Sequence, residues 1–108
     1  MSDYVSVYMT ASSAEEADRI ASALVEERLA ACVNILGGIR SVYRWDGAVQ
    51  CGAEVALIAK TRAALFDALA ARARALHSYE VPCIVCWPIE AGNPAYLTWI
   101  GDETAGRR

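Results

Sequence analysis

The chain carries few of the side chains that enzymes and metal sites use most often. It has one histidine, His77, and one lysine, Lys60, which stands among nine arginines. Histidine titrates near neutral pH, and the lone lysine could be a charge partner for a ligand. Each residue also has an explanation without a functional role. His77 follows a predicted helix, whose dipole favours a cation at its C-terminal end. Lys60 could simply be a surface residue, because lysines are usually exposed. No catalytic triad, Cys/His pair or phosphate-binding glycine loop is visible, so we expect a protein that is not an enzyme.

The four cysteines are Cys32, Cys51, Cys83 and Cys86. The last two are spaced as Cys-x-x-Cys, which occurs in redox and zinc sites. Their neighbours are typical of a strand, on which an offset of three residues places side chains on opposite faces, roughly 10 Å apart along the axis. We therefore expect thiols that pack as small buried hydrophobic residues. With one histidine in the chain, a metal site would be sparse and soft, and would suit copper better than zinc.

Composition limits the class of protein. A chain of 108 residues is one ordinary domain, which we expect to span residues 1–102, with a frayed tail over 103–108. Apolar residues make up 56% of the chain, which excludes intrinsic disorder, and the net charge of −3 argues against nucleic-acid binding. No apolar run is long enough to span a membrane, and the first residues do not resemble a signal peptide. We therefore expect a cytoplasmic protein.

Hydrophobic periodicity predicts an α+β protein with the order β-α-β-β-α-β and a short last helix. Ser13 and Glu16 form a capping box for the first helix, and Thr61 is a candidate cap for the second. Asp46-Gly47 is typical of a two-residue hairpin turn, and Gly37-Gly38 of a bulge. This order is ferredoxin-like, with two helices on one face of an antiparallel sheet. The expected strands are 3–10, 31–36 continuing over 39–45, 48–60 and 83–89; the expected helices are 14–28, one containing the apolar stripe 65–76, and 94–101.

The predicted hairpin is long for so small a domain. Its second strand, 48–60, would extend roughly 43 Å, whereas a folded chain of this length has a radius of gyration of about 13 Å. The two helices cannot cover its outer part, which carries Tyr43 and Trp45. Because an uncovered strand edge pairs readily with another chain, we expect a homo-oligomer in which strands continue across subunits.

A turn at 46–47 also predicts which residues lie opposite each other. Tyr43 then faces Gln50 and Glu54 faces Ile39, unless the glycine pair shifts the register. Glu54 and Lys60 share a face of their strand but lie roughly 20 Å apart. A site that uses both therefore requires a second subunit or a strong bend.

Several short segments follow one another at distinctive spacings: ACVNI (31–35), SVYRWDG (41–47), Glu54, Lys60-Thr61, HSYEVP (77–82), Pro88-Ile89 and GNPAYLTWI (92–100). Together they cover nearly the whole chain, and their combination resembles the CutA family, the divalent-cation tolerance proteins. The resemblance implies a ferredoxin-like fold and a tight homotrimer similar to the PII signalling proteins. It also implies a cytoplasmic protein linked to tolerance of copper and other divalent ions.

The resemblance further implies where a ligand would bind. Family members gather polar and aromatic residues in clefts between subunits, and the matching positions here are Tyr43, Trp45, Glu54, Lys60, Tyr79 and Trp99. The metal candidates are His77 and Met9, which stand where some bacterial members have histidine and cysteine. Methionine with histidine could bind Cu(I), although less well than a Cys/His/His set.

Three other functions stay open at this point. The chain could be a PII-like sensor of a small anionic ligand paired with Lys60, or an enzyme with Glu54, Tyr79 or His77 as acid–base groups. It could also be a trimeric scaffold without a ligand. We favour a trimer that acts in metal-ion tolerance and binds metal ions or a small ligand in its clefts.

Overall fold

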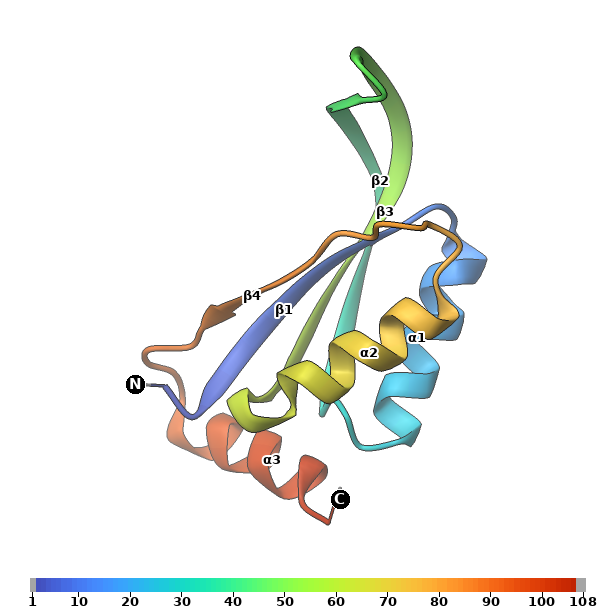
Figure 1. Ribbon diagram of the computed structural model, residues 1–108. Helices are drawn as coiled ribbons and strands as arrows, with labels where there is room; N and C mark the ends of the chain where they lie inside the picture. The colour runs from blue at the N-terminus through green and yellow to red at the C-terminus, as the bar shows by residue number, and fades with distance from the viewer. Residues whose placement is uncertain (1, 107–108) are drawn as a thin grey trace.

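The fold is built on an antiparallel sheet flanked by helices (Figure 1). The computed structural model describes residues 2–106. Its strands are β1 (Tyr4–Ala11), β2 (Cys32–Trp45), β3 (Ala48–Arg62) and β4 (Ile84–Pro88), and its helices are α1 (Ala14–Glu26), α2 (Phe66–Leu76) and α3 (Pro94–Thr104). The strand order is β2-β3-β1-β4. Helices α1 and α2 cover one face of the sheet and α3 lies at one end of it, which confirms the predicted α+β, ferredoxin-like fold.

Helix α1 begins at a local capping signal. The Ser13 hydroxyl accepts a hydrogen bond from the backbone N–H of Glu16 (3.1 Å), which is one half of the predicted capping box. The Glu16 carboxylate accepts from the backbone N–H of Ser12 (2.9 Å) rather than from that of Ser13. The helix ends at Glu26, two residues before the predicted end, because Arg28 has a left-handed conformation with φ of 58°.

The prediction that Thr61 caps the second helix is wrong. Thr61 lies in β3, is fully buried, and donates its hydroxyl proton to the backbone oxygen of Leu29 (2.7 Å). A 3₁₀ turn at Ala63–Leu65 then leads into α2, which begins without a side-chain cap. The Thr61 hydrogen bond therefore links β3 to the loop after α1.

Helix α3 is longer than predicted. It continues past Gly101, where the sequence predicted its end, to Thr104. Thr104 is fully buried, and Arg62 donates to its hydroxyl (3.0 Å) and to its backbone oxygen (2.8 Å). Residues 103–104 of the expected frayed tail are thus helical, because a tertiary contact holds them. Residues 107–108 of that tail lie outside the described residues.

The outer part of the β2–β3 hairpin, residues 39–54, projects from the body as an arm (Figure 1). Strand β1 pairs with β3 only from Val55 onward, so the arm has no third strand beside it. The turn residues Asp46 and Gly47 both have positive φ (55° and 79°), as a type I′ turn requires. The arm gives the molecule dimensions of 44 × 25 × 22 Å, and it confirms the predicted overhang.

The predicted register holds along the arm. Tyr43 lies opposite Gln50, and Glu54 lies opposite Ile39. A bulge between Leu36 and Ile39 then shifts the pairing by one residue, so that Lys60 lies opposite Cys32. The glycine pair therefore acts as the sequence suggested, and the shift adds curvature to the strand.

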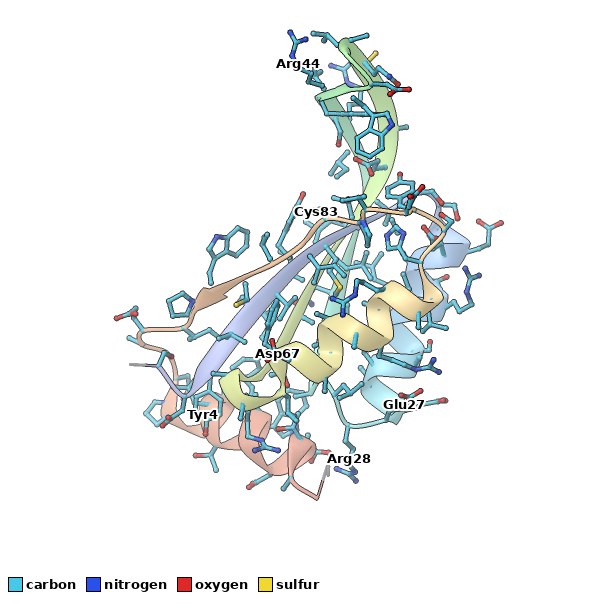
Figure 2. All side chains as sticks on the ribbon, viewed as in Figure 1. Tyr4, Glu27, Arg28, Arg44, Asp67 and Cys83 are labelled. Atoms are coloured by element: carbon cyan, nitrogen blue, oxygen red, sulfur yellow. The ribbon has the colours of Figure 1, made fainter. Side chains whose placement is uncertain are left out.

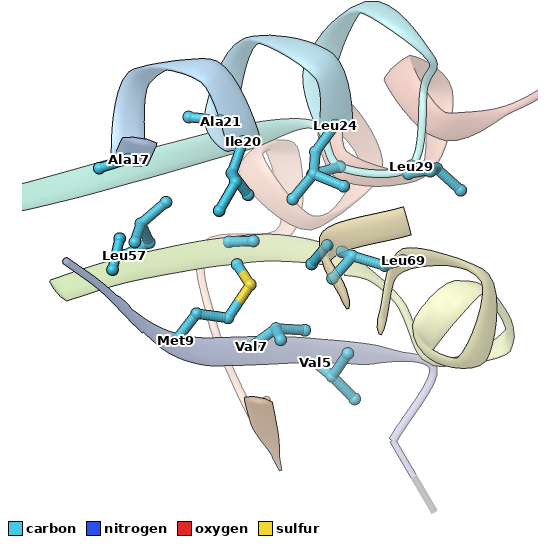
Figure 3. Packing of buried hydrophobic residues seen from close by; sticks show 14 residues of the cluster. Val5, Val7, Met9, Ala17, Ile20, Ala21, Leu24, Leu29, Leu57 and Leu69 are labelled. Carbon is cyan, nitrogen blue, oxygen red and sulfur yellow. The ribbon is translucent and has the colours of Figure 1, made fainter. Parts of the chain in front are cut away.

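The hydrophobic core lies between the sheet and helices α1 and α2 (Figure 3). Val7 of β1 and Leu57 of β3 point into it and are fully buried, and their neighbours in each strand point to the opposite face of the sheet. Several large apolar side chains stay exposed on the arm and on β4, such as Val42 at 75% and Trp87 at 52%. Within residues 2–106, no helix is long and apolar enough to cross a membrane.

Replacing a core leucine should test this packing. Leu69 of α2 is fully buried, so Leu69→Ala should lower the free energy of unfolding by about 2–5 kcal/mol. The control Val25→Ala, on an α1 residue that is 41% exposed, should cost less than about 1 kcal/mol. Urea denaturation at a fixed protein concentration measures both variants. Equal losses would contradict the assigned core.

Candidate functional site

A cavity of about 560 Å³ lies where the arm meets the body. Glu54 and Tyr8 occupy strand positions that alternate with the buried core residues, so the cavity lies on the sheet face opposite to α1 and α2. The chain between α2 and β4 forms another wall, near Cys83 at the base of the arm (Figure 2). The lining residues are Tyr8, Thr10, Ser41, Tyr43, Trp45, Glu54, Tyr79, Glu80, Val81 and Cys83.

One hydrogen bond joins the two walls of the cavity. The Tyr79 hydroxyl donates to Oε2 of Glu54 at 2.8 Å. Burial, followed by this hydrogen bond and the negative charge of Glu54, raises the pKa of Tyr79 to about 12. The phenol therefore stays protonated at neutral pH and presents a donor to the carboxylate. Glu54 and Tyr79, both predicted as cleft residues, are thus in direct contact.

A buried carboxylate on α1 holds the segment that carries Tyr79. Glu16 is only 3% exposed, and its two oxygens accept the backbone N–H of Ser12 (2.9 Å) and of Ser78 (2.7 Å). Burial alone would raise the pKa of Glu16, but these bonds and those of the Ser12 and Ser78 hydroxyls lower it to about 2. Arg19 Nη2 also lies 3.8 Å from the carboxylate. The start of α1 is thereby tied to the residue directly before Tyr79.

His77 supports the same segment from inside. Its side chain is 1% exposed, and its Nδ1 accepts the backbone N–H of Tyr79 at 3.0 Å. Nε2 then carries the proton and donates to the backbone oxygen of Thr10 at 2.7 Å. With both nitrogens engaged, the imidazole offers no lone pair to a metal in this conformation.

The predicted metal pair is not supported by these contacts. Met9 is 2% exposed and belongs to the hydrophobic core, and His77 uses both of its nitrogens as described above. Among the residues that the structure describes, no group of three or more His, Cys, Asp and Glu side chains is placed to hold a metal ion. His77 is therefore a positioning residue for the cavity.

The other two predicted cleft residues lie away from the cavity. Lys60 is six residues further along β3 than Glu54, and it donates to the side-chain oxygen of Asn34. Trp99 lies on α3, where its ring is 5.5 Å from that of Tyr96. The predicted cleft is therefore divided in one chain into a cavity group at the arm and a second group near α3.

The cysteines are thiols, as predicted, but they are not buried. Cys51, Cys83 and Cys86 are exposed and Cys32 is half-buried. Cys51 lies on the arm, Cys86 in β4 and Cys83 directly before β4, so all three are outside the core. Partial burial and the charge of Glu54 raise the pKa of the Cys83 thiol. The Cys32 sulfur contacts the Tyr96 hydroxyl at 3.3 Å. That hydrogen bond, with burial, raises the pKa of Tyr96 to about 12.

Sequence reasoning missed part of the cavity lining. Tyr8 and Thr10 occupy alternate positions of β1 on the same face as Glu54, so strand alternation could have suggested them once the sheet order was known. Glu80 and Cys83 had no such signal, because they lie in irregular chain whose path depends on packing.

Comparison with known proteins gives a consistent result. Residues 5–103 match the family model described as CutA1 divalent ion tolerance protein. The divalent-cation tolerance protein CutA of Thermus thermophilus is 51% identical over 98 residues, which make up 91% of this chain and 95% of that protein. Protein CutA 1, chloroplastic, from Oryza sativa is 48% identical over 91% of this chain, and the chain spans only 55% of its length. The crystal structure of CutA1 from Oryza sativa has a TM-score of 0.94 at 45% identity, covering 97% of this chain and 96% of that one.

Glu16 should make stability depend on pH. Its folded pKa lies below the ordinary value of 4.5, so its contribution is complete above pH 4.5 and disappears as the pH falls towards 2. At pH 7, Glu16→Gln should lower the free energy of unfolding by about 3 kcal/mol, while the exposed first-turn control Glu15→Gln should cost less than about 1 kcal/mol. Urea denaturation at pH 7 and pH 3 measures this. A loss for Glu16→Gln that is unchanged at pH 3 would contradict the role of its charge.

Glu54 should control the titration of Tyr79. In Glu54→Gln the pKa of Tyr79 should fall from about 12 towards 10, because the adjacent negative charge is gone. NMR of protein with ¹³C-labelled tyrosine at pH 11 should then show a larger ionised fraction of Tyr79 in the variant than in the unchanged protein, while burial keeps part of the shift. Tyr79→Phe assigns the signal, and the exposed Glu90→Gln is the control. An unshifted Tyr79 signal in Glu54→Gln would contradict the contact.

Proposed function

The chain belongs to the family of CutA1 divalent ion tolerance proteins, and from this premise we propose that it is a homotrimeric binding protein with clefts between its subunits. In this proposal each cleft combines the cavity of one subunit with the Lys60 and Trp99 group of another. Its ligand is a small molecule or a metal ion, and its role is binding rather than catalysis. The family description, which refers to tolerance of ions and to no reaction, supports this choice.

The observation that carries the proposal is the separation of the two predicted halves of the cleft. Glu54 and Lys60 lie on the same face of one continuous strand, six residues and therefore roughly 20 Å apart. Lys60 is not among the residues that line the cavity of Glu54, and it donates to Asn34 whereas Glu54 accepts from Tyr79. A second copy of the chain is the simplest source of the missing half.

The exposed apolar surface favours an assembly of this kind. Val85 and Trp87 lie on the edge strand β4 and are 47% and 52% exposed, and Val49 on the arm is 65% exposed. Exposed strand edges and apolar patches of this kind are typical of surfaces that other chains cover. A closed ring of identical contacts would bury them without leaving an unpaired end, and the number three comes from the family resemblance.

The cavity favours some ligands over others. It holds two carboxylates, and none of its lining residues is basic, so it does not suit the small anionic ligand that Lys60 suggested. A copper ion, or another divalent ion, would need side chains from several subunits, because no three-ligand group exists among the described residues. We retain the cytoplasm as the proposed location, while the rice relative is named as chloroplastic.

Native mass spectrometry tests the assembly and the metal together. We expect a species of three times the chain mass of 11.6 kDa, and we expect Trp87→Glu to shift it to the monomer by placing a charge in the contact. Copper that the trimer retains after competition with a chelator would identify the ligand as a metal ion, and a trimer without copper would favour a small molecule. A monomer under all conditions would overturn the proposed clefts.

A further inference from the structure

The cavity at the base of the arm has an unusual combination of walls. Four aromatic rings line it, from Tyr8, Tyr43, Trp45 and Tyr79, together with the carboxylates of Glu54 and Glu80. Aromatic faces and carboxylates both attract positive charge, since the ring quadrupole places negative potential over the face. Neither group attracts anions.

The negative charge of the cavity is not balanced by an ion pair among residues 2–106. Among the described residues, neither Glu54 nor Glu80 takes part in an ion pair. Glu54 uses Oε2 to accept the Tyr79 proton, and a carboxylate has further lone pairs that can accept more bonds. The nearest basic residues along the arm, Arg40 and Arg44, alternate with the cavity-facing positions and point to the opposite face.

We propose that this cavity binds a small organic cation, an ammonium group with an apolar body, held between the Glu54 carboxylate and the faces of Trp45 and Tyr43. The volume of about 560 Å³ is within the range of small-molecule sites. A quaternary or primary ammonium needs an aromatic wall and one carboxylate, whereas a divalent metal needs several converging ligands. The inference rests on the proposed function, because it identifies the ligand class of the proposed cleft.

A second source of positive charge must be distinguished from a soluble ligand. The same chemistry would accept a lysine side chain of another copy, and Lys60 is the lone lysine of the chain. We assign the cavity to a soluble cation because Lys60 already has a partner in Asn34, and because the cavity is larger than one ammonium group requires. The variant Lys60→Met distinguishes a soluble cation from a lysine of another copy, because it removes the lysine.

The test compares choline with 3,3-dimethyl-1-butanol, its uncharged isostere, on the full chain in its native assembly. Isothermal titration calorimetry at low salt gives the two dissociation constants. Choline should bind at least tenfold more tightly than the isostere. Glu54→Gln should weaken choline at least tenfold and leave the isostere unchanged, because only the charge contribution is removed.

Matched variants control for damage to the fold. Glu90→Gln, on an exposed carboxylate outside the cavity, should bind choline as the unchanged protein does. Trp45→Phe should keep most of the affinity because it keeps an aromatic face, and Trp45→Leu should lose at least fivefold. Lys60→Met removes the positive charge that the proposed cleft brings from another subunit, so it should not weaken choline binding.

Each other outcome overturns the inference in a recognisable way. Equal binding of choline and its isostere would show an apolar groove, and binding by Lys60→Met alone would show that a lysine of a second copy fills the cavity. The inference would also be overturned if neither the unchanged protein nor Lys60→Met bound choline. Native mass spectra of the same samples separate the two proposals: a trimer that ignores choline removes only the ligand class, and a monomer that binds it removes only the assembly.

Discussion

The length of β3 is the constraint on which the other features depend. This strand has 15 residues and β1 has 8, and β1 pairs with β3 only over Val55–Arg62. The remaining residues of β3 can pair only with β2, so the hairpin leaves the body as an arm. The arm and the chain between α2 and β4 are the walls of the cavity. A hairpin matched to β1 in length would leave no such cavity and no exposed arm.

The buried carboxylate of Glu16 connects this constraint to the rest of the fold. It joins the first turn of α1 to Ser78, and the next residue, Tyr79, reaches Glu54 at the base of the arm. His77 adds a bond to β1 through the backbone of Thr10. The only histidine of the chain, which invited a metal or acid–base role, is thus part of a structural network. In this structure it holds the backbone of Tyr79 in place.

The two ends of β3 differ in charge within one chain. The cavity end carries Glu54 and aromatic rings, and the other end carries Lys60 beside Asn34 and Cys32. A family described by tolerance of divalent cations would suggest a metal-ligand cluster, which the described residues do not form. In the cation site that we propose, positive charge would be attracted instead by the Glu54 and Glu80 carboxylates and by aromatic faces, which act on organic cations as well as on metal ions.

Much of the fold could be predicted from the sequence because the signals are local. Asp46-Gly47 specifies a tight turn and thereby the register of the arm, Ser13 specifies the start of α1, and strand alternation places Glu54 and Lys60 on one face. Other features depend on residues far apart in the chain: Glu16 meets Ser78 across 62 positions, Thr61 meets Leu29 across 32, and Arg62 holds the end of α3 across 42. The sequence by itself therefore determined the elements and the long hairpin, and its family resemblance pointed to four of the cavity residues. Only the tertiary structure decided that His77 supports the site, that Tyr8 and Cys83 line it, and that Lys60 lies outside it, because those outcomes depend on how the elements pack.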